Sequence, residues 1–296
     1  MKIGVCGTGR MGTAIAQRLL SLDDQVAVWN RNPEKTHPLT AAGATSCASP
    51  AELVGACDIV IVMLLNDAAT AAVYQGPGGI LAGPLEGRLV IDMSSVRPDT
   101  MVRSGAAVRQ RQGSFVECPV GGSTAPAREG KLFGLVGGAA ADIARAQPVL
   151  DLLCRRIEHV GELGAGATLK LAINLPLLVY WQALGEALTL CQDLQLPADR
   201  LIDILSDTAG TPTAMKGRGA VIARMLNGAP PGETAFGLSA ATKDLATAVQ
   251  FAAARHVRLP VATSALTCFE EAEAAGLGEA DATAIAARWP RHSASP

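Results

Sequence analysis

Histidine is scarce in this sequence, and cysteine follows no metal-binding or disulfide pattern. The four histidines, His37, His159, His256 and His292, are scattered, and no two stand at the spacing of metal ligands. The seven cysteines include no C-x-x-C pair, and their odd number argues against a complete disulfide framework. We therefore predict no metal site, and we expect the cysteines to be small buried side chains in a reducing cytoplasm.

The sequence also lacks an excess of charge of either sign. Its 25 basic and 27 acidic residues give a net charge of −2, and no block of like charges occurs. A nucleic-acid-binding domain normally presents a basic face, so we expect no nucleic-acid partner.

Long hydrophobic runs are absent as well. The most apolar short run, Ile59–Leu65, is far shorter than the roughly 20 residues that a membrane-spanning helix needs. The chain begins directly on MKIGVCG, without the charged and apolar regions of a signal peptide, so we expect a cytoplasmic protein with no membrane partner. Hydrophobic residues still make up 49% of the 296 residues, which is enough for a buried core and suits two domains.

Short β-like runs and helical stretches alternate through the first half of the chain. The runs are rich in valine and isoleucine and end at glycine, proline, aspartate or serine: KIGVCG, QVAVWN, DIVIVML, RLVIDMS, SFVECPV and LFGLVGG. Ala- and Leu-rich stretches such as MGTAIAQRLLSL separate them. Strands that alternate with helices predict βαβ units and a parallel sheet.

After about Val160 the strand signals stop. Ala- and Leu-rich stretches with helical periodicity take over, at Gly166–Leu194, Pro197–Leu205, Ala214–Leu226, Ser239–Arg255 and Pro260–Ala275. We therefore predict an α/β domain over residues 1–162 and an all-α domain over residues 163–296, with no proline- or glycine-rich linker between them. The polar tail PRHSASP is expected to be disordered.

A G-x-G-x-x-G pattern, formed by Gly7, Gly9 and Gly12, follows the first predicted strand and opens a helix, which is the context that a dinucleotide site requires. Gly7 permits a tight turn, Gly9 lets a pyrophosphate approach the backbone, and Gly12 lets the helix pack on the strand. The helix N-terminus adds N–H groups and the positive end of its dipole. The alternative is a plain glycine-rich turn. We predict a Rossmann domain whose cofactor contacts Gly7, Thr8, Gly9, Arg10, Met11 and Gly12.

The end of the second predicted strand indicates which dinucleotide binds. NAD enzymes usually place Asp or Glu there to hold the ribose 2′-hydroxyl. This chain has Asn30 and Arg31, with Lys35 one turn further, so no carboxylate repels a 2′-phosphate and a guanidinium can pair with it. We therefore favour NADP over NAD. The alternative is a solvated arginine on an ordinary loop.

Two later strand ends complete the predicted cofactor site. In an open α/β sheet, ligands lie beyond the carboxyl ends of the strands. The segments MLLNDAA and IDMSS stand at such ends, so Met63, Leu64, Leu65 and Ser95 are placed to line the cofactor.

The segment CPVGGSTAP, Cys118–Pro126, follows the fifth apolar run. Its consecutive small residues expose backbone N–H groups, and such a nest can bind a carboxylate without a cationic side chain. Taken alone, the segment is better interpreted as a flexible turn.

The segment GAGATLKLAIN, Gly164–Asn174, holds a lysine and an asparagine in an apolar run. If it is helical, Lys170 and Asn174 stand at i and i+4 and share one face. A single lysine in a helix is usually solvated, but this one has an amide partner, nearby glycines and a nucleotide domain before it. A lysine shielded from water beside a cationic nicotinamide is suited to proton transfer near neutral pH.

Together these motifs resemble the β-hydroxyacid dehydrogenases, the 3-hydroxyisobutyrate dehydrogenase-like family. The resemblance covers nearly the whole chain, because G-x-G-x-M-G, IDMSS, CPVGGSTAPAREGKLFGLVGG, GAGATLKLAIN and FGLSAATKDL occur in the family's order. It implies a Rossmann domain followed by a 6-phosphogluconate dehydrogenase-like helical domain, and a homodimer or homotetramer packed through the helical part.

The resemblance also implies roles for single residues. Lys170 would be the acid/base that gives a proton to the carbonyl oxygen as hydride arrives from the nicotinamide, and Asn174 would orient Lys170 or that oxygen. Gly121, Gly122 and Ser123 would hold a substrate carboxylate through backbone N–H groups.

On the same basis, Ser95 would lie between cofactor and substrate, and Phe236 would help to wall the pocket. Lys243 would reach the cofactor from the helical domain.

Three features depart from the family's usual pattern. Gly121 stands where the family usually has serine, and Ser239 and Ala240 stand where it often has Asp and Leu. Pro176 cannot donate a backbone hydrogen bond, so a kink is expected two residues past Asn174.

We therefore predict an NADP-dependent oxidoreductase that interconverts a small β-hydroxy acid and the matching aldehyde or keto acid. Two alternatives remain. One is an imine reductase, although those enzymes generally lack the lysine at position 170. The other is a module that binds NADP without chemistry.

Overall fold

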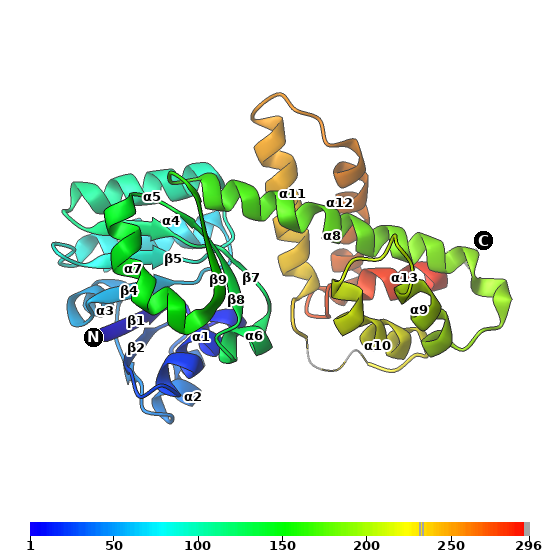
Figure 1. The fold of residues 1–296 in the computed structure, drawn as a ribbon, viewed down its shortest axis with the longest axis horizontal. Helices are drawn as coiled ribbons and strands as arrows, with labels where there is room; N and C mark the ends of the chain where they lie inside the picture. Colours follow the sequence, from blue (N-terminus) through cyan, green and yellow to red (C-terminus); the bar gives the residue numbers. More distant parts are fainter. Residues whose placement is uncertain (231, 233, 293–296) are drawn as a thin grey trace. The chain divides into compact units, whose positions relative to one another are not determined.

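The computed structural model describes residues 1–230, 232 and 234–292 and divides into two compact units (Figure 1). The first unit is Met1–Leu171, and the second begins at Ala172. The division falls inside helix α8 (Ala165–Leu190), which starts in the first unit and continues into the second. The domain boundary predicted from the sequence, between residues 162 and 163, precedes this helix.

The first unit is built on a nine-stranded sheet with the strand order β3-β2-β1-β4-β5-β6-β8-β7, and β9 also pairs with β8. The six predicted strands are all present, and they are joined by three that were not predicted, β3, β7 and β9. The bounds are β1 Lys2–Cys6, β2 Gln25–Trp29, β3 Thr45–Ser46, β4 Ile59–Val62, β5 Leu89–Asp92, β6 Ser114–Glu117, β7 Val120–Gly121, β8 Leu132–Gly137 and β9 Cys154–Gly161.

The prediction of a parallel sheet is correct for β1 to β6 and for the pair β8 and β9, and it is wrong where β8 meets β6 and β7. Strand β8 pairs antiparallel with both β6 and β7, and only its pairing with β9 is parallel. Only the short helix α6 (Thr124–Arg128) separates β7 from β8, so there is no full crossover helix to return the chain in the parallel direction.

Helices cover both faces of the sheet, so the central strands β4 and β5 are buried along their whole length. Alternate residues of the strands pack into two separate cores. One core includes α1 and α7, and the other includes α3, α4 and α5. The helices of this unit are α1 Arg10–Leu20, α2 His37–Thr40, α3 Pro50–Ala56, α4 Asp67–Gln75, α5 Pro98–Gln110, α6 and α7 Ala140–Leu153, with short 3-10 turns at Pro33–Thr36 and Ile80–Ala82.

The second unit is helical in the part of the chain that the structure describes. The five predicted helices are confirmed, as α8, α9 Ala198–Ser206, α10 Ala214–Leu226, α11 Leu238–Ala253 and α12 Pro260–Ala272. Short turns lie at Gln192–Leu194 and Glu273–Leu277, and a further helix, α13 (Ala284–His292), was not predicted. The expectation of a disordered tail from Pro290 is wrong for residues 290–292, which end α13. Residues 293–296 lie outside the described residues.

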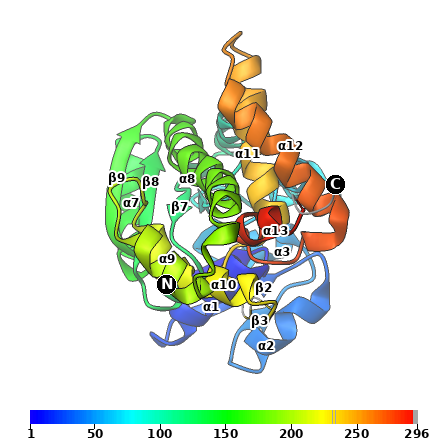
Figure 2. The same cartoon turned by 90° about the vertical axis from the view of Figure 1, so that its right-hand side faces the viewer.

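The core of the second unit is formed by the apolar faces of these helices. Both views show α11 and α12 side by side (Figures 1 and 2). Helix α8 contributes Leu178, Trp181, Leu184 and Leu188 to this core. Among the described helices, α8 alone has the length and composition that would allow it to cross a membrane, and one of its faces packs into the core of the second unit. It continues through Pro176 without a break.

Candidate active site

The glycine-rich loop between β1 and α1 has the geometry that its spacing predicts. Gly7 has a φ of +99°, and a Cβ there would lie 2.4 Å from the carbonyl oxygen of Met63. A Cβ on Gly12 would lie 1.9 Å from the carbonyl oxygen of Gly7. Gly9 precedes the first residue of α1 and has no atom within 4 Å of a Cβ position. Backbone atoms therefore crowd the loop at Gly7 and Gly12. At Gly9 the loop is open, where a phosphate would approach the helix N-terminus.

Asn30 at the end of β2 holds this loop in place. Its side-chain oxygen accepts a hydrogen bond from the Thr8 N–H at 3.1 Å, and its amide donates to the Asn32 carbonyl at 2.9 Å. The Thr8 hydroxyl donates to the Lys35 carbonyl at 3.2 Å. The Asn30 side chain therefore supports the loop, while Arg31 and Lys35 are exposed.

The loops after β4 and β5 are joined by a buried polar chain. The Ser94 hydroxyl accepts a hydrogen bond from the Leu64 N–H at 2.9 Å, and the Ser94 N–H donates to Asp92 at 3.0 Å. The Tyr74 hydroxyl donates to the other oxygen of Asp92 at 2.8 Å. Burial raises the pKa of this fully buried carboxyl above its usual range. Ser95, which was predicted to line the cofactor, directly follows Ser94 of this hydrogen-bonded series and is half-buried.

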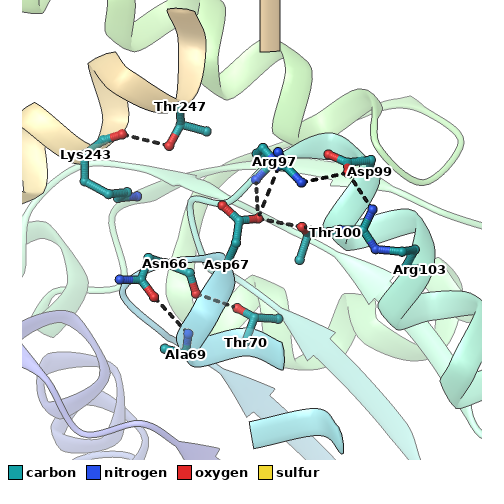
Figure 3. A network of polar contacts seen from close by, with 10 residues as sticks. All are labelled: Asn66, Asp67, Ala69, Thr70, Arg97, Asp99, Thr100, Arg103, Lys243 and Thr247. Atoms are coloured by element: carbon teal, nitrogen blue, oxygen red, sulfur yellow. Dashed lines mark hydrogen bonds and ion pairs between the residues drawn. The ribbon is translucent and has the colours of Figure 1, made fainter. Parts of the chain in front are cut away.

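A second network joins the same two loops nearer the surface (Figure 3). One Asp67 oxygen, at the start of α4, accepts hydrogen bonds from the Arg97 N–H at 3.1 Å and from the Thr100 hydroxyl at 2.5 Å. The Arg97 and Arg103 side chains both donate to Asp99. These contacts fix the start of α5 against the start of α4.

The predicted cofactor-lining residues after β4 differ in exposure. Met63 and Leu64 are half-buried, whereas the Leu65 side chain is 61% exposed. The backbone of this segment is held by the Leu64 N–H, and the Met63 and Leu64 side chains pack against the two cores of the sheet.

The predicted carboxylate nest lies at β7 and the start of α6. Gly122 has a φ of +121°, and a Cβ there would lie 2.9 Å from a Leu132 methyl group. At Gly121 the nearest atom to a Cβ position is 3.6 Å away, so a side chain fits there without displacing the backbone. The backbone conformation therefore requires glycine at position 122, whereas position 121 could carry a larger side chain.

Glu117, at the end of β6, was not singled out from the sequence. One of its carboxylate oxygens accepts hydrogen bonds from the N–H groups of Gly164 at 2.7 Å and Gly166 at 2.8 Å, at the start of α8. Burial, the largest effect, raises the pKa of this carboxyl to about 7, although backbone N–H groups oppose the shift. Lys170 lies one turn after Gly166 on the same helix and is only 9% exposed.

The second unit brings two of the predicted residues together. The Asn174 amide donates a hydrogen bond to one oxygen of Asp244 at 2.8 Å, and the Lys243 ammonium forms an ion pair with the other oxygen. Asp244 is 4% exposed, and its buried carboxylate is paired with one cation and one amide donor. The Lys243 carbonyl accepts a hydrogen bond from Thr247 (Figure 3). Sequence reasoning missed Asp244, although it directly follows Lys243 in TKDL.

Phe236 lies just before α11 and is 36% exposed. Its carbonyl accepts a hydrogen bond from the Ala282 N–H at 2.8 Å. Within residues 1–230, 232 and 234–292, no group of three or more His, Cys, Asp or Glu side chains is placed to hold a metal ion.

Two protein-family models match the chain one after the other. The NAD binding domain of 6-phosphogluconate dehydrogenase matches residues 2–161. The model described as NAD-binding of NADP-dependent 3-hydroxyisobutyrate dehydrogenase matches residues 164–289.

Individual relatives match nearly the full length. Glyoxylate/succinic semialdehyde reductase 1 of Arabidopsis thaliana is 36% identical over 285 residues, which are 96% of this chain and 97% of that protein. The 3-hydroxyisobutyrate dehydrogenase of Mycobacterium tuberculosis, solved with L-serine, has a TM-score of 0.84 and 25% identity over 100% of this chain and 99% of that one. Psf3 in complex with NADP+ and 2-OPP has a TM-score of 0.85 and 27% identity, covering 97% and 99%.

The raised pKa of Glu117 predicts a pH-dependent stability. Between the unfolded value of 4.5 and the folded value of about 7, only the folded chain keeps this proton, so its stabilising contribution is lost as pH rises through 7. The free energy of unfolding of the protein, minus that of Glu117→Gln, should fall by about 3 kcal/mol between pH 4.5 and 8.

Urea titrations at several pH values measure this difference. Glu158→Gln, which removes an exposed carboxylate paired with Arg156, is the matched control and should show no such fall. A difference that stays constant with pH for Glu117→Gln would contradict the assignment.

Proposed function

This chain belongs to the β-hydroxyacid dehydrogenase family and is an NAD(P)-dependent oxidoreductase, and on that premise we propose that it uses NADP(H) to reduce a small aldehyde or keto acid, with Lys170 as proton donor. The observation that carries the proposal is the placement of Lys170. It is buried on the second turn of α8, and the start of that helix is held by the sheet of the nucleotide-binding unit.

The proposed chemistry assigns one task to each group. When bound, a reduced nicotinamide would supply the hydride that the carbonyl carbon receives. The Lys170 ammonium donates its proton to the carbonyl oxygen as charge develops there, and in the oxidation direction the neutral amine takes the proton back. Asn174 is proposed to orient Lys170 or the substrate oxygen, and its amide is itself fixed by Asp244.

Backbone groups are proposed to recognise the substrate carboxylate. Gly121, Gly122 and Ser123 stand where consecutive N–H groups can point at an anion, and the positive φ of Gly122 supports such a nest. Ser95 is proposed to lie between cofactor and substrate, and Phe236 to wall the pocket. Glyoxylate and succinic semialdehyde, which name a relative at 36% identity, are the test substrates.

The NADP preference rests on the end of β2. Asn30 supports the glycine loop and Arg31 is exposed beside it, with Lys35 nearby and no carboxylate from residue 30 to 33. An exposed guanidinium can pair with a 2′-phosphate in two hydrogen bonds. Lys243 is proposed as a further cofactor contact from the second unit.

Two other functions stay testable. An imine reductase would turn over a cyclic imine faster than an aldehyde acid, and a non-catalytic module would bind NADPH tightly without turning over either. The buried Lys170 favours the aldehyde-acid reductase, because imine reductases generally lack a lysine at this position and a non-catalytic module needs no proton donor.

Replacing Lys170 is the direct test of the mechanism. Lys170→Ala should lower kcat for glyoxylate or succinic semialdehyde reduction by about 10² to 10⁴, since that is the usual contribution of a positioned acid. The dissociation constant of NADPH should change little. Lys216→Ala, an exposed lysine on α10, is the control and should keep full activity. Full activity of Lys170→Ala would remove the mechanism.

Arg31→Ala tests the choice of cofactor. Loss of a guanidinium–phosphate pair should raise the KM for NADPH about 10- to 100-fold and leave the KM for NADH almost unchanged. Arg88→Ala breaks an exposed ion pair with Asp58 at the opposite end of the sheet and serves as control. An equal effect on both cofactors would show that Arg31 does not read the 2′-phosphate.

The protein is proposed to act in the cytoplasm as a homodimer or homotetramer. All seven cysteines are free, which fits a reducing compartment. Several large apolar side chains of the second unit are exposed, including Leu190, Leu194, Leu196 and Ile204, and such a surface favours self-association. Cell fractionation followed by sedimentation velocity of the soluble fraction should find an oligomer, and a monomer at micromolar concentration would contradict it.

A further inference from the structure

Glu117 makes a helix cap that comes from a distant part of the chain. Its Oε1 accepts the N–H groups of Gly164 and Gly166 at 2.7 and 2.8 Å, and the N–H of Ala167 contributes a third hydrogen bond to the carboxylate. These donors lie just before and in the first turn of α8, where backbone N–H groups have no partner within the helix. The glutamate side chain is fully buried.

The surrounding glycines leave room for this carboxylate. A Cβ on Gly137, in β8, would lie 2.3 Å from Oε1 of Glu117, and a Cβ on Gly166 would lie 3.2 Å from it. Gly164 has a φ of +97°, a conformation that aims its N–H at the carboxylate and that other residues rarely adopt. Two segments far apart in sequence, β8 at Gly137 and the start of α8 at Gly164 and Gly166, are thus adapted to one side chain.

A cap supplied by a distant strand restrains the position of a helix more than a cap supplied by the residue before it. A serine or aspartate directly before a helix satisfies its N–H groups but leaves the helix free to shift against its neighbours. Glu117 ties the first turn of α8 to the end of β6, 47 and 49 residues away in sequence. Above its pKa of about 7 the carboxyl is ionised, and its charge then also interacts favourably with the positive end of the helix dipole.

The two ends of this tie are both proposed parts of the reaction site. Lys170 lies one helical turn beyond Gly166, so fixing Gly166 fixes the turn from which Lys170 projects. On the other side, Glu117 is followed directly by Cys118, Pro119 and Val120, which lead into Gly121 of the carboxylate nest. One side chain therefore joins the segment that would hold the substrate carboxylate to the helix that carries the proton donor.

We propose that Glu117 is a positioning residue, which holds the start of α8 at a fixed place relative to β6 and so places the Lys170 amine for proton transfer. The inference rests on the proposed role of Lys170 and adds a residue that acts through it. The second oxygen of Glu117 is buried and has no hydrogen-bond partner among the described residues. A carboxylate, a carboxylic acid and an amide can all keep Oε1 as the acceptor.

Two variants separate geometry from charge. Glu117→Asp keeps the carboxyl but draws the acceptor back by one methylene, whereas Glu117→Gln keeps an acceptor at the same reach. We expect Glu117→Asp to lower kcat for reduction of glyoxylate or succinic semialdehyde 10- to 100-fold, with the KM values within threefold. Glu117→Gln should stay within fivefold of the parent kcat. Glu158→Gln, an exposed strand glutamate, is the control for surface effects.

The same substitutions in a Lys170→Ala background test whether Glu117 affects kcat through Lys170. If Glu117 acts through Lys170, Glu117→Asp should change the residual kcat less than twofold there. A loss of equal size in both backgrounds, or an unchanged kcat for Glu117→Asp, would overturn the proposal.

A measurement without turnover keeps this test separate from the proposed function. Competitive labelling by acetic anhydride, followed by mass spectrometry, gives the rate at which each lysine reacts. The rate at Lys170 relative to Lys216 should change severalfold in Glu117→Asp and stay near the parent value in Glu117→Gln. If the parent protein reduces neither compound, the proposed function fails, while an unchanged labelling ratio would sink the role of Glu117 by itself.

Discussion

The contact between the Glu117 carboxylate and the start of α8 is the constraint on which the proposed site depends. It joins a strand of the nucleotide-binding sheet to the helix that carries Lys170 and then runs on into the second unit. The donors are three N–H groups that a helix end otherwise leaves to water. A buried acceptor at this point converts the most mobile end of a helix into a fixed one.

Other carboxyl groups of the chain also tie separate segments together. Asp92 holds Ser94, which holds the backbone after β4, and Asp67 ties the start of α5 to the start of α4. In the second unit Asp244 holds Asn174 and Lys243. In each case a carboxyl accepts hydrogen bonds or an ion pair from separate segments, with Asp92 and Asp244 buried and Asp67 partly exposed, and such a network holds those segments in one arrangement.

Much of the fold and part of the site could be read from local sequence patterns. Valine-rich runs and helical periodicity identified six strands and five helices, and the glycine spacing located the loop before α1. The edge strand β9 was missed because it is half-exposed and carries Arg155, Arg156 and Glu158. Glu117 and Asp244 were missed for a different reason. Their partners are 47 and 70 residues away, and no local spacing reports a contact at that distance.

Native-state hydrogen exchange at the start of α8 tests the central claim most directly. Amides in the first turn of a helix ordinarily exchange through local fraying, because nothing protects them. The account predicts that the amides of Gly164, Gly166 and Ala167 in the parent protein exchange as slowly as those of β5 and β6. Exchange of these three amides at the rate of an unprotected helix end would show that the Glu117 cap does not hold the helix, and would contradict the account.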